Sequence, residues 1–224
     1  MRKVDPEKHA ARRQAILDAA KACFAKRGFH QTSTAEICAA VGMSPGNLFH
    51  YFPNKQAIIG AIVDQEGEET AVFFRDLGAR DDLYGALVEF MDVVLELAGD
   101  VDFSSLALEI SAEAGREPAI AARVGRNDRE LRAALEQLLT DAAARGQVDP
   151  TLDMADTATW IAALVDGVFN RVAVDPEFKP ENHHKTIRTL LGRYLRPQAE
   201  TEIMRPQAEA ENMRPQAETE STKS

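Results

Sequence analysis

Apolar residues recur at spacings of three and four along most of this 224-residue chain, and alternating β-branched runs are missing. Such spacing places the apolar side chains on one face of a helix. The pattern therefore predicts an all-α fold of about nine helices.

Helix start and stop signals give these helices approximate bounds. The first is expected to begin after Asp5, with Pro6 at its first position, and to end at Gly28. A long helix is expected after Asn54. The remaining helices are expected over 82–98, 103–114 and 118–145, after Asp153, and over 181–195.

Between the first helix and the long one lies the stretch TSTAEICAAVGMSPGNLFHYF, residues 32–52, which contains the signals for two short helices. Ser33 and Glu36 have the spacing of a capping box, which starts the first of them. Gly42 allows a sharp turn, and Ser44 then caps a second helix with Pro45 at its first position.

The second short helix has an outer face that the core does not use. Leu48 and Phe52 are four residues apart and are expected to point inward. The outward set is Gly46, Asn47, Phe49 or His50, and Tyr51. Glycine inside a helix costs about 0.5 to 1 kcal/mol relative to alanine, so Gly46 suits a place that another molecule approaches closely. The arrangement is that of a helix-turn-helix, whose second helix enters the DNA major groove.

Free N–H groups at helix N-termini bind phosphates, and this segment has three such termini. The natural phosphate contacts are Thr32, Ser33, Ser44, Tyr51 and Lys55. Simple capping would explain the hydroxyl groups equally well, so the prediction depends on their gathering around one exposed helix.

Charge is distributed unevenly along the chain. Residues 1–60 hold nine Lys/Arg against four Asp/Glu, whereas residues 61–224 hold 17 against 32. A basic head on an acidic body suggests a head that binds a polyanion, although chance clustering is an alternative.

The run from Gly28-Phe29 through Thr32-Ser33, Ile37 and GMSPGNLFHYF to Lys55 closely resembles the DNA-binding head of the TetR (tetracycline-repressor-like) family of bacterial transcriptional regulators. The resemblance covers about residues 10–60, with conservative departures at Cys38, Val41 and Met43. It implies phosphate contacts from Thr32, Ser44, Tyr51 and Lys55, and groove contacts from Pro45, Gly46, Asn47 and His50. It also implies a homodimer, a palindromic double-stranded DNA operator and a C-terminal pocket for a small-molecule effector.

Beyond the head, only the helix count and a few short motifs, such as RGQVDP and DGVF, support the resemblance, so the body is interpreted from its residues. The last two helices are the best dimerisation candidates, because 160–172 is apolar on more than one side; a fully buried central helix is the alternative. The predicted interface is Leu164, Val168, Ile187, Leu191 and Tyr194.

For the effector pocket we expect large apolar side chains together with a few polar ones. The predicted lining is Phe90, Met91, Phe103, Leu106, Trp160 and Phe169, with Glu109, Asp166 and Asn170 as polar groups. A carboxylate there could orient a cationic or hydrogen-bonding ligand. The alternative is that these are ordinary core aromatics and half-exposed acids.

Other function classes have little support in the sequence. No apolar run reaches the roughly 18 to 20 residues of a membrane span, and no secretory signal is evident, so we expect a cytoplasmic protein with no membrane partner. Cys23 and Cys38 fall at apolar helical positions and predict no disulfide. His183 and His184 are adjacent and do not form a metal clamp, and no catalytic or cofactor motif is present. We expect no enzyme, cofactor or metal.

The chain ends in three copies of a nine-residue unit, starting at 196, 205 and 214, each rich in Pro, Gln and Glu. They predict a disordered tail, or short helical turns ordered by a partner. The predicted division is a helix-turn-helix head (1–53), an effector-binding and dimerisation body (54–195) and the tail (196–224). The predicted function is a ligand-responsive repressor. The alternatives are an activator with the same head and an interaction module that does not use its head for DNA.

Overall fold

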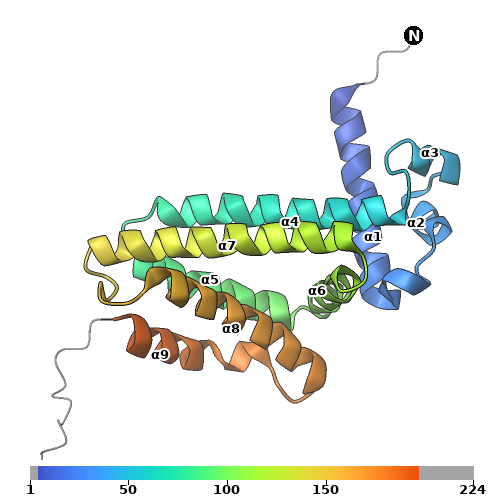
Figure 1. Cartoon of the computed structure of the whole chain (residues 1–224). Helices are drawn as coiled ribbons and strands as arrows, with labels where there is room; N and C mark the ends of the chain where they lie inside the picture. The colour runs from blue at the N-terminus through green and yellow to red at the C-terminus, as the bar shows by residue number, and fades with distance from the viewer. Residues whose placement is uncertain (1–4, 197–224) are drawn as a thin grey trace, which may run out of the picture.

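The computed structural model describes residues 5–196, and within them every regular element is a helix (Figure 1). The elements are α1 (Pro6–Gln31), α2 (Thr34–Val41), α3 (Pro45–Phe49), α4 (Lys55–Gly78), α5 (Leu83–Gly99), α6 (Val101–Ala114), α7 (Pro118–Ala144), α8 (Met154–Val174), the 3-10 helix η1 (Pro180–Asn182) and α9 (His184–Leu195). The prediction of an all-α fold with about nine helices is confirmed. The predicted tail lies outside the described residues, apart from Arg196.

The helix N-termini follow their capping residues closely. Side chains that accept hydrogen bonds from the first turn are found at each predicted N-cap: Asp5, Ser33, Ser44, Asn54 and Asp153. The last helix begins at His184, after the 3-10 helix η1, instead of at residue 181, and the first helix ends later than predicted. The chain turns at Gly28, with φ 77°, but helical residues continue as far as Gln31. A positive φ suits glycine because it has no Cβ, so Gly28 bends the helix and a final turn follows it.

The described residues form two apolar cores. The first joins α1, α2 and α3 to the beginning of α4, and also includes Leu106 and Ile110 of α6 and Ile120 of α7. The second lies between the rest of α4, α5, α7, α8 and α9. In Figure 1 the head, α1 to α3, lies at one end, and α4 runs from it into the body beside α7. Helix α4 therefore contributes to both cores.

Helices α4 and α7 run in the same direction and pack directly on each other near the head. Asn127 Nδ2 of α7 donates to the carbonyl of Val63, at 2.7 Å. Asp64 is ion-paired with both Arg123 and Arg126. A Cβ on Gly67 would lie only 2.6 Å from Asn127 Oδ1, so the absence of a side chain at Gly67 permits this contact.

Neither the helices nor the cysteines point to a membrane or a disulfide in residues 5–196. None of these helices combines the length and the apolar character needed to cross a bilayer. Cys38 is buried, Cys23 is half-buried, and both are free thiols.

Candidate nucleic-acid interface and ligand cavity

The short helix α3 is built by local chemistry and anchored by two side chains. Ser44 Oγ accepts a hydrogen bond from the Asn47 N–H, at 3.4 Å, and Pro45 occupies the first helical position. Leu48 is fully buried and Phe52 nearly so, as their spacing predicts. The anchored face fixes which residues of α3 point outward.

The outward face of α3 is open to solvent. Pro45, Gly46, Asn47, Phe49 and His50 are all exposed, and Phe49 is 48% exposed despite its size. α3 also lies at the end of the molecule away from the body (Figure 1). This end of the molecule therefore presents a narrow surface of small, polar and aromatic groups.

Gly46 has no structural reason to be glycine. Its φ is not in the left-handed region, and a Cβ added to it would meet no atom within 4 Å. Neither backbone strain nor packing in the chain therefore excludes a side chain. An exposed glycine on this face would allow the close approach of another molecule.

Tyr51 lies beside the exposed face and is held by a ring from α1. It is half-buried, and its ring stacks on that of His9 with centroids 4.7 Å apart. This contact orients the phenol at the edge of the outward surface of α3.

The predicted hydroxyl contacts differ in their availability. Ser33 and Ser44 are exposed at the N-termini of α2 and α3. Ser33 Oγ also donates to Glu36 Oε2, at 2.8 Å, within the capping box. Thr32 is only 1% exposed, and its hydroxyl lies 2.8 Å from the Gly28 carbonyl oxygen. The prediction that this hydroxyl contacts a phosphate is therefore not compatible with its position, because it points into the bend of α1.

Lys55 was also predicted to contact a phosphate, but its ammonium group points towards the end of α1. Its Nζ donates to the carbonyls of Phe29, at 2.5 Å, and Thr32, at 2.9 Å, and lies 4.4 Å from the centroid of the Phe29 ring. Burial lowers the pKa of Lys55, while the charge of Glu113 acts in the opposite direction. Lys55 therefore joins the first turn of α4 to the end of α1. The predicted phosphate contact is corrected, because the ammonium group already donates to carbonyls of the chain.

Helix α6 holds the same bend from the other side. Glu109 Oε2 accepts a hydrogen bond from the Phe29 N–H, at 2.8 Å. The buried carboxylate of Glu113 lies 3.1 Å from His30 Nε2. Two carboxylates of α6 thus contact the two residues that follow Gly28, and they attach the head to the body.

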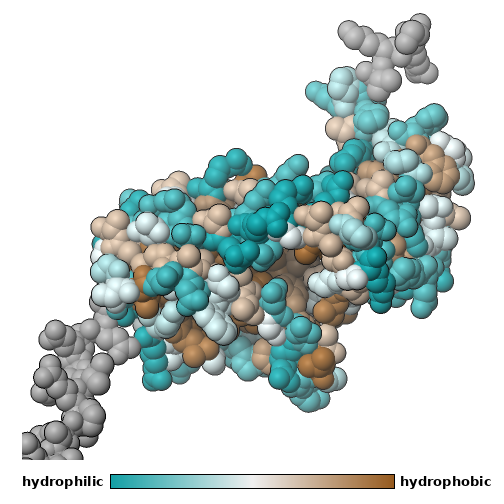
Figure 2. Space-filling model, in the orientation of Figure 1, coloured by the Kyte–Doolittle hydropathy of each residue, from teal (hydrophilic) through white to brown (hydrophobic). Residues whose placement is uncertain are grey.

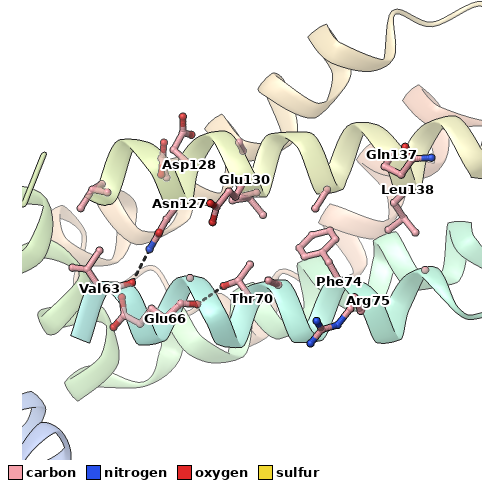
Figure 3. Close-up of a pocket in the computed structure, with 18 of the residues that line it drawn as sticks. Val63, Glu66, Thr70, Phe74, Arg75, Asn127, Asp128, Glu130, Gln137 and Leu138 are labelled. Atoms are coloured by element: carbon pink, nitrogen blue, oxygen red, sulfur yellow. Dashed lines mark hydrogen bonds between the residues drawn. The ribbon is translucent and has the colours of Figure 1, made fainter. Parts of the chain in front are cut away.

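A cavity of about 550 Å³ lies between α4, α7 and α8, a volume typical of small-molecule sites. Figure 3 shows side chains of α4 and α7 facing one another along it. Its lining is Val63, Glu66, Gly67, Thr70, Ala71, Phe74, Arg75, Gly78, Ile110, Val124, Asn127, Asp128, Glu130, Leu131, Ala134, Gln137, Leu138, Asp141, Ala162 and Asp166. On the face drawn in Figure 2 the surface is hollowed between α7 and α8, near α6.

Of the nine residues predicted to line a pocket, Asp166 alone lines this cavity. Phe90, Met91 and Leu106 are packed in the two cores, and the carboxylate of Glu109 is engaged by the head. Phe103 and Phe169 contact each other, with ring centroids 6.0 Å apart, whereas Trp160 and Asn170 are exposed. The predicted apolar residues were the wrong ones: the apolar part of the cavity is formed by Val63, Phe74, Ile110, Val124, Leu131 and Leu138, beside charged and small residues of α4 and α7.

Two carboxyl groups in the cavity have altered acidity. Burial raises the pKa of Glu66 to about 7, with Lys21 opposing the shift and Glu69 adding to it. Burial, together with the charge of Asp128, raises the pKa of Asp166. Glu66 is half-buried, whereas Asp166 is exposed, so the loss of solvation is greater at Glu66.

The outer faces of α8 and α9 expose large apolar side chains. Trp160, Leu164, Leu190 and Tyr194 are between 39% and 63% exposed. Of the predicted interface residues, Leu164 and Tyr194 belong to this surface. Val168, Ile187 and Leu191 are instead buried in the body core.

Metal ligands do not gather in the part of the chain that the structure describes, where no group of three or more His, Cys, Asp or Glu side chains could hold an ion. His184 instead contacts Asp92, with Nδ1 2.7 Å from Oδ1.

Comparison with known proteins agrees with this geometry. Residues 16–62 match the family described as "Bacterial regulatory proteins, tetR family", and residues 84–196 match "BetI-type transcriptional repressor, C-terminal". The transcriptional regulator UidR of Escherichia coli K12 is 28% identical over 188 residues, which cover 82% of this chain and 92% of UidR.

Solved structures have the same fold. Salmonella enterica GusR is 34% identical, with a TM-score of 0.71, covering 83% of this chain and 95% of GusR. FadR from Bacillus subtilis, in complex with stearoyl-CoA, is 21% identical, with a TM-score of 0.67, covering 80% of this chain and 96% of FadR. The open helix-turn-helix, the helical body and these matches together show that the chain belongs to the TetR family of bacterial transcriptional regulators.

Proposed function

We propose that this DNA-binding regulator is a cytoplasmic repressor, which binds a palindromic operator as a homodimer and is released when a small molecule occupies the cavity between α4, α7 and α8. The observation that carries the DNA-binding part is the exposed α3 face, with Gly46 open to solvent and unexplained by packing. In the proposed division, residues 1–53 are the DNA-binding head and residues 54–195 the regulatory body.

The proposed base contacts come from the N-terminal half of α3. The major groove is about 12 Å wide and admits a helix whose first residues reach the base edges. Pro45, Gly46, Asn47, Phe49 and His50 line that approach. Asn47 has the donor and acceptor groups needed for a bidentate contact with adenine.

The proposed phosphate contacts flank α3. Ser33 and Ser44 lie at helix N-termini, where free N–H groups attract anions, and Tyr51 lies beside them. Thr32 and Lys55 are left out of this set. They support the head from inside, through the carbonyls that they contact at the end of α1.

The proposed dimer surface is the exposed apolar stripe of α8 and α9. Trp160 and Leu164 are four residues apart on α8, as are Leu190 and Tyr194 on α9, so each pair shares one helix face. Gly167 continues the α8 stripe, and no other atom lies near its missing Cβ, which leaves room for close helix packing. A second copy of the chain would cover this surface and give the two heads the two-fold symmetry of a palindrome.

Two helices connect the cavity with the head. α4 lines the cavity from Val63 to Gly78, and its first turn holds the end of α1 through Lys55. Ile110 of α6 lines the cavity, and the adjacent Glu109 accepts a hydrogen bond from the Phe29 N–H. A ligand that favours a different position of either helix would therefore move the head and alter the spacing of the two reading helices. The stearoyl-CoA bound by the Bacillus subtilis relative supports an organic effector for this fold.

Selection from random double-stranded DNA tests the proposal. We expect a palindromic consensus, and we expect Asn47→Ala to relax the preference at one position of each half-site, because only one base contact is lost. No enrichment by the wild-type protein would contradict DNA reading. In vitro transcription from a promoter that overlaps the selected site should fall when the protein is added, whereas a rise would identify an activator.

A further inference from the structure

The walls of the cavity are strongly acidic. Five carboxylate side chains line it, against a single cationic one, Arg75. The five are Glu66, Asp128, Glu130, Asp141 and Asp166. This imbalance gives the cavity a negative potential that a ligand would meet on entry.

Two of the five carboxylates, Glu66 and Asp166, have neither a hydrogen-bond nor an ion-pair partner among residues 5–196, whereas Glu130 lies 3.9 Å from Arg126. Asp128 is bonded to Arg132, at 2.9 Å, and Asp141 accepts from Gln137, at 3.0 Å. The charge that acts on Asp166 is that of Asp128, which repels it. The raised pKa of both groups agrees with this lack of compensation.

Carboxylates are more numerous at the Val63 end of the cavity, although Asp141 lies beyond Leu138 at the other end. Figure 3 shows Glu66, Asn127 and Asp128 at the end near Val63, and Phe74 and Leu138 farther along α4 and α7. From Val63 to Gly78 the wall formed by α4 is roughly 22 Å long, at the helical rise of 1.5 Å per residue. Phe74 and Leu138 therefore offer an apolar surface away from the more acidic end, although Arg75 and Asp141 also border it.

We propose that the ligand of this cavity is an elongated apolar molecule with one cationic group, a protonated amine or a quaternary ammonium, at the end bordered by Glu66, Asp128 and Asp166. Its chain lies along Phe74 and Leu138. This inference rests on the proposed function, since it names the chemical class of the effector. A cation would pair with the half-buried Glu66 and with the exposed Asp166, which has no ion-pair partner among residues 5–196.

Calorimetry on the full-length protein tests this with three eight-carbon probes of matched chain length. We expect octyltrimethylammonium to bind more tightly than octan-1-ol, and octanoate to bind most weakly, because the probes differ chiefly in the charge of their head group. Octanoate binding as tightly as octyltrimethylammonium would overturn the inference.

Variants then locate the cationic end. Asp166→Asn keeps the shape of the side chain and removes its charge, and we expect it to weaken octyltrimethylammonium binding about tenfold while leaving octan-1-ol binding unchanged. The matched control is Glu136→Gln, which removes a charge from the exposed side of α7 outside the cavity. Equal effects of the two variants on octyltrimethylammonium would overturn the assignment.

Operator binding by the ligand-free protein, measured in parallel, separates the two proposals. If the protein binds DNA and octanoate is preferred to octyltrimethylammonium, the proposed function as a DNA-binding regulator is supported and the inferred ligand class is wrong. If the protein binds no DNA but prefers octyltrimethylammonium in a manner that depends on Asp166, the proposed function is wrong and the ligand class stands.

Discussion

At the scale of single residues, Gly46 is the position where a substitution is expected to affect DNA binding without disturbing the fold. No atom of the chain lies near its missing Cβ, and its backbone does not require glycine. The fold therefore tolerates a side chain at this position, and only a bound molecule would contact it.

We expect Gly46→Ala to raise the free energy of unfolding, by up to about 1 kcal/mol, because alanine favours helix. Affinity for the selected DNA should fall at least about tenfold, the size of a lost base contact, because the methyl group keeps α3 away from the groove. Denaturant unfolding and fluorescence anisotropy measure the two effects. Gly78→Ala, equally unhindered at the end of α4, is the control. Unchanged DNA affinity of Gly46→Ala would contradict the close approach.

The raised pKa of Glu66 predicts how the free energy of unfolding depends on pH. Its pKa is raised to about 7 in the folded chain, from 4.5, because the cavity desolvates its carboxylate. The folded state therefore holds this proton more tightly than the unfolded chain does. The protonated Glu66 carboxyl therefore contributes stability that is fully present below about pH 4.5. This contribution is lost as the pH rises through about 7.

We expect Glu66→Gln to be more stable than the wild type at pH 8, on the order of 1 to 3 kcal/mol, and nearly equal to it at pH 4. Chemical unfolding of both proteins at the two pH values measures the difference. A difference that does not change with pH would show that the Glu66 carboxylate is not desolvated.

At the scale of elements, the joint between α6 and the bend of α1 attaches the head to the body. The Phe29 N–H is satisfied by Glu109 of α6, and the Phe29 carbonyl by Lys55 of α4. Breaking one of these bonds leaves a polar group of the bend without its partner, which is costly where water does not replace it.

We expect Glu109→Ala to lower the free energy of unfolding by about 1 to 3 kcal/mol and to weaken operator binding, because the bend of α1 loses one of its polar contacts with the body. Glu109→Gln keeps an acceptor oxygen and should lie close to the wild type. Unfolding and operator affinity of both variants are the measurements. Equal behaviour of the alanine and glutamine variants would mean that this hydrogen bond does not position the head.

The elements also show what the sequence can predict. The helix starts at Ser33, Ser44 and Asn54 were predictable because a capping side chain contacts residues only two or three positions away. The same local rules predicted which face of α3 is exposed.

Features that depend on distant packing were not predictable in this way. Lys55 has the sequence position of a phosphate contact, but the carbonyls that it meets come from residues 23 and 26 positions earlier in the chain. Trp160 was predicted to line a pocket, but it is 63% exposed, because apolar spacing does not distinguish a core face from a face for a partner. The cavity is lined by residues of four helices, α4, α6, α7 and α8, and its mixed apolar, small and charged lining has no periodic signal.

At the scale of the whole molecule, the exposed stripe on α8 and α9 is the surface that a second copy would cover. Leu164 lies within the stripe, and its exposure costs free energy in a monomer. A charge introduced there should be tolerated by the isolated chain and not by a dimer.

We expect Leu164→Glu to sediment as a monomer and to bind a two-half-site operator on the order of 100-fold more weakly than the wild type, because the two heads no longer act together. Val72→Glu, on an exposed position of α4, is the control and should stay dimeric. A dimeric Leu164→Glu would place the interface elsewhere.

The central claim is that the open face of α3 enters the major groove of DNA. Methylation interference on the selected operator tests it most directly, because guanine N7 lies in the major groove and adenine N3 in the minor groove. We predict that methylation of guanine N7 blocks binding within two symmetric half-sites, and that His50→Ala or Asn47→Ala changes the pattern inside them. Interference confined to adenine N3, or none at either position, would contradict the claim.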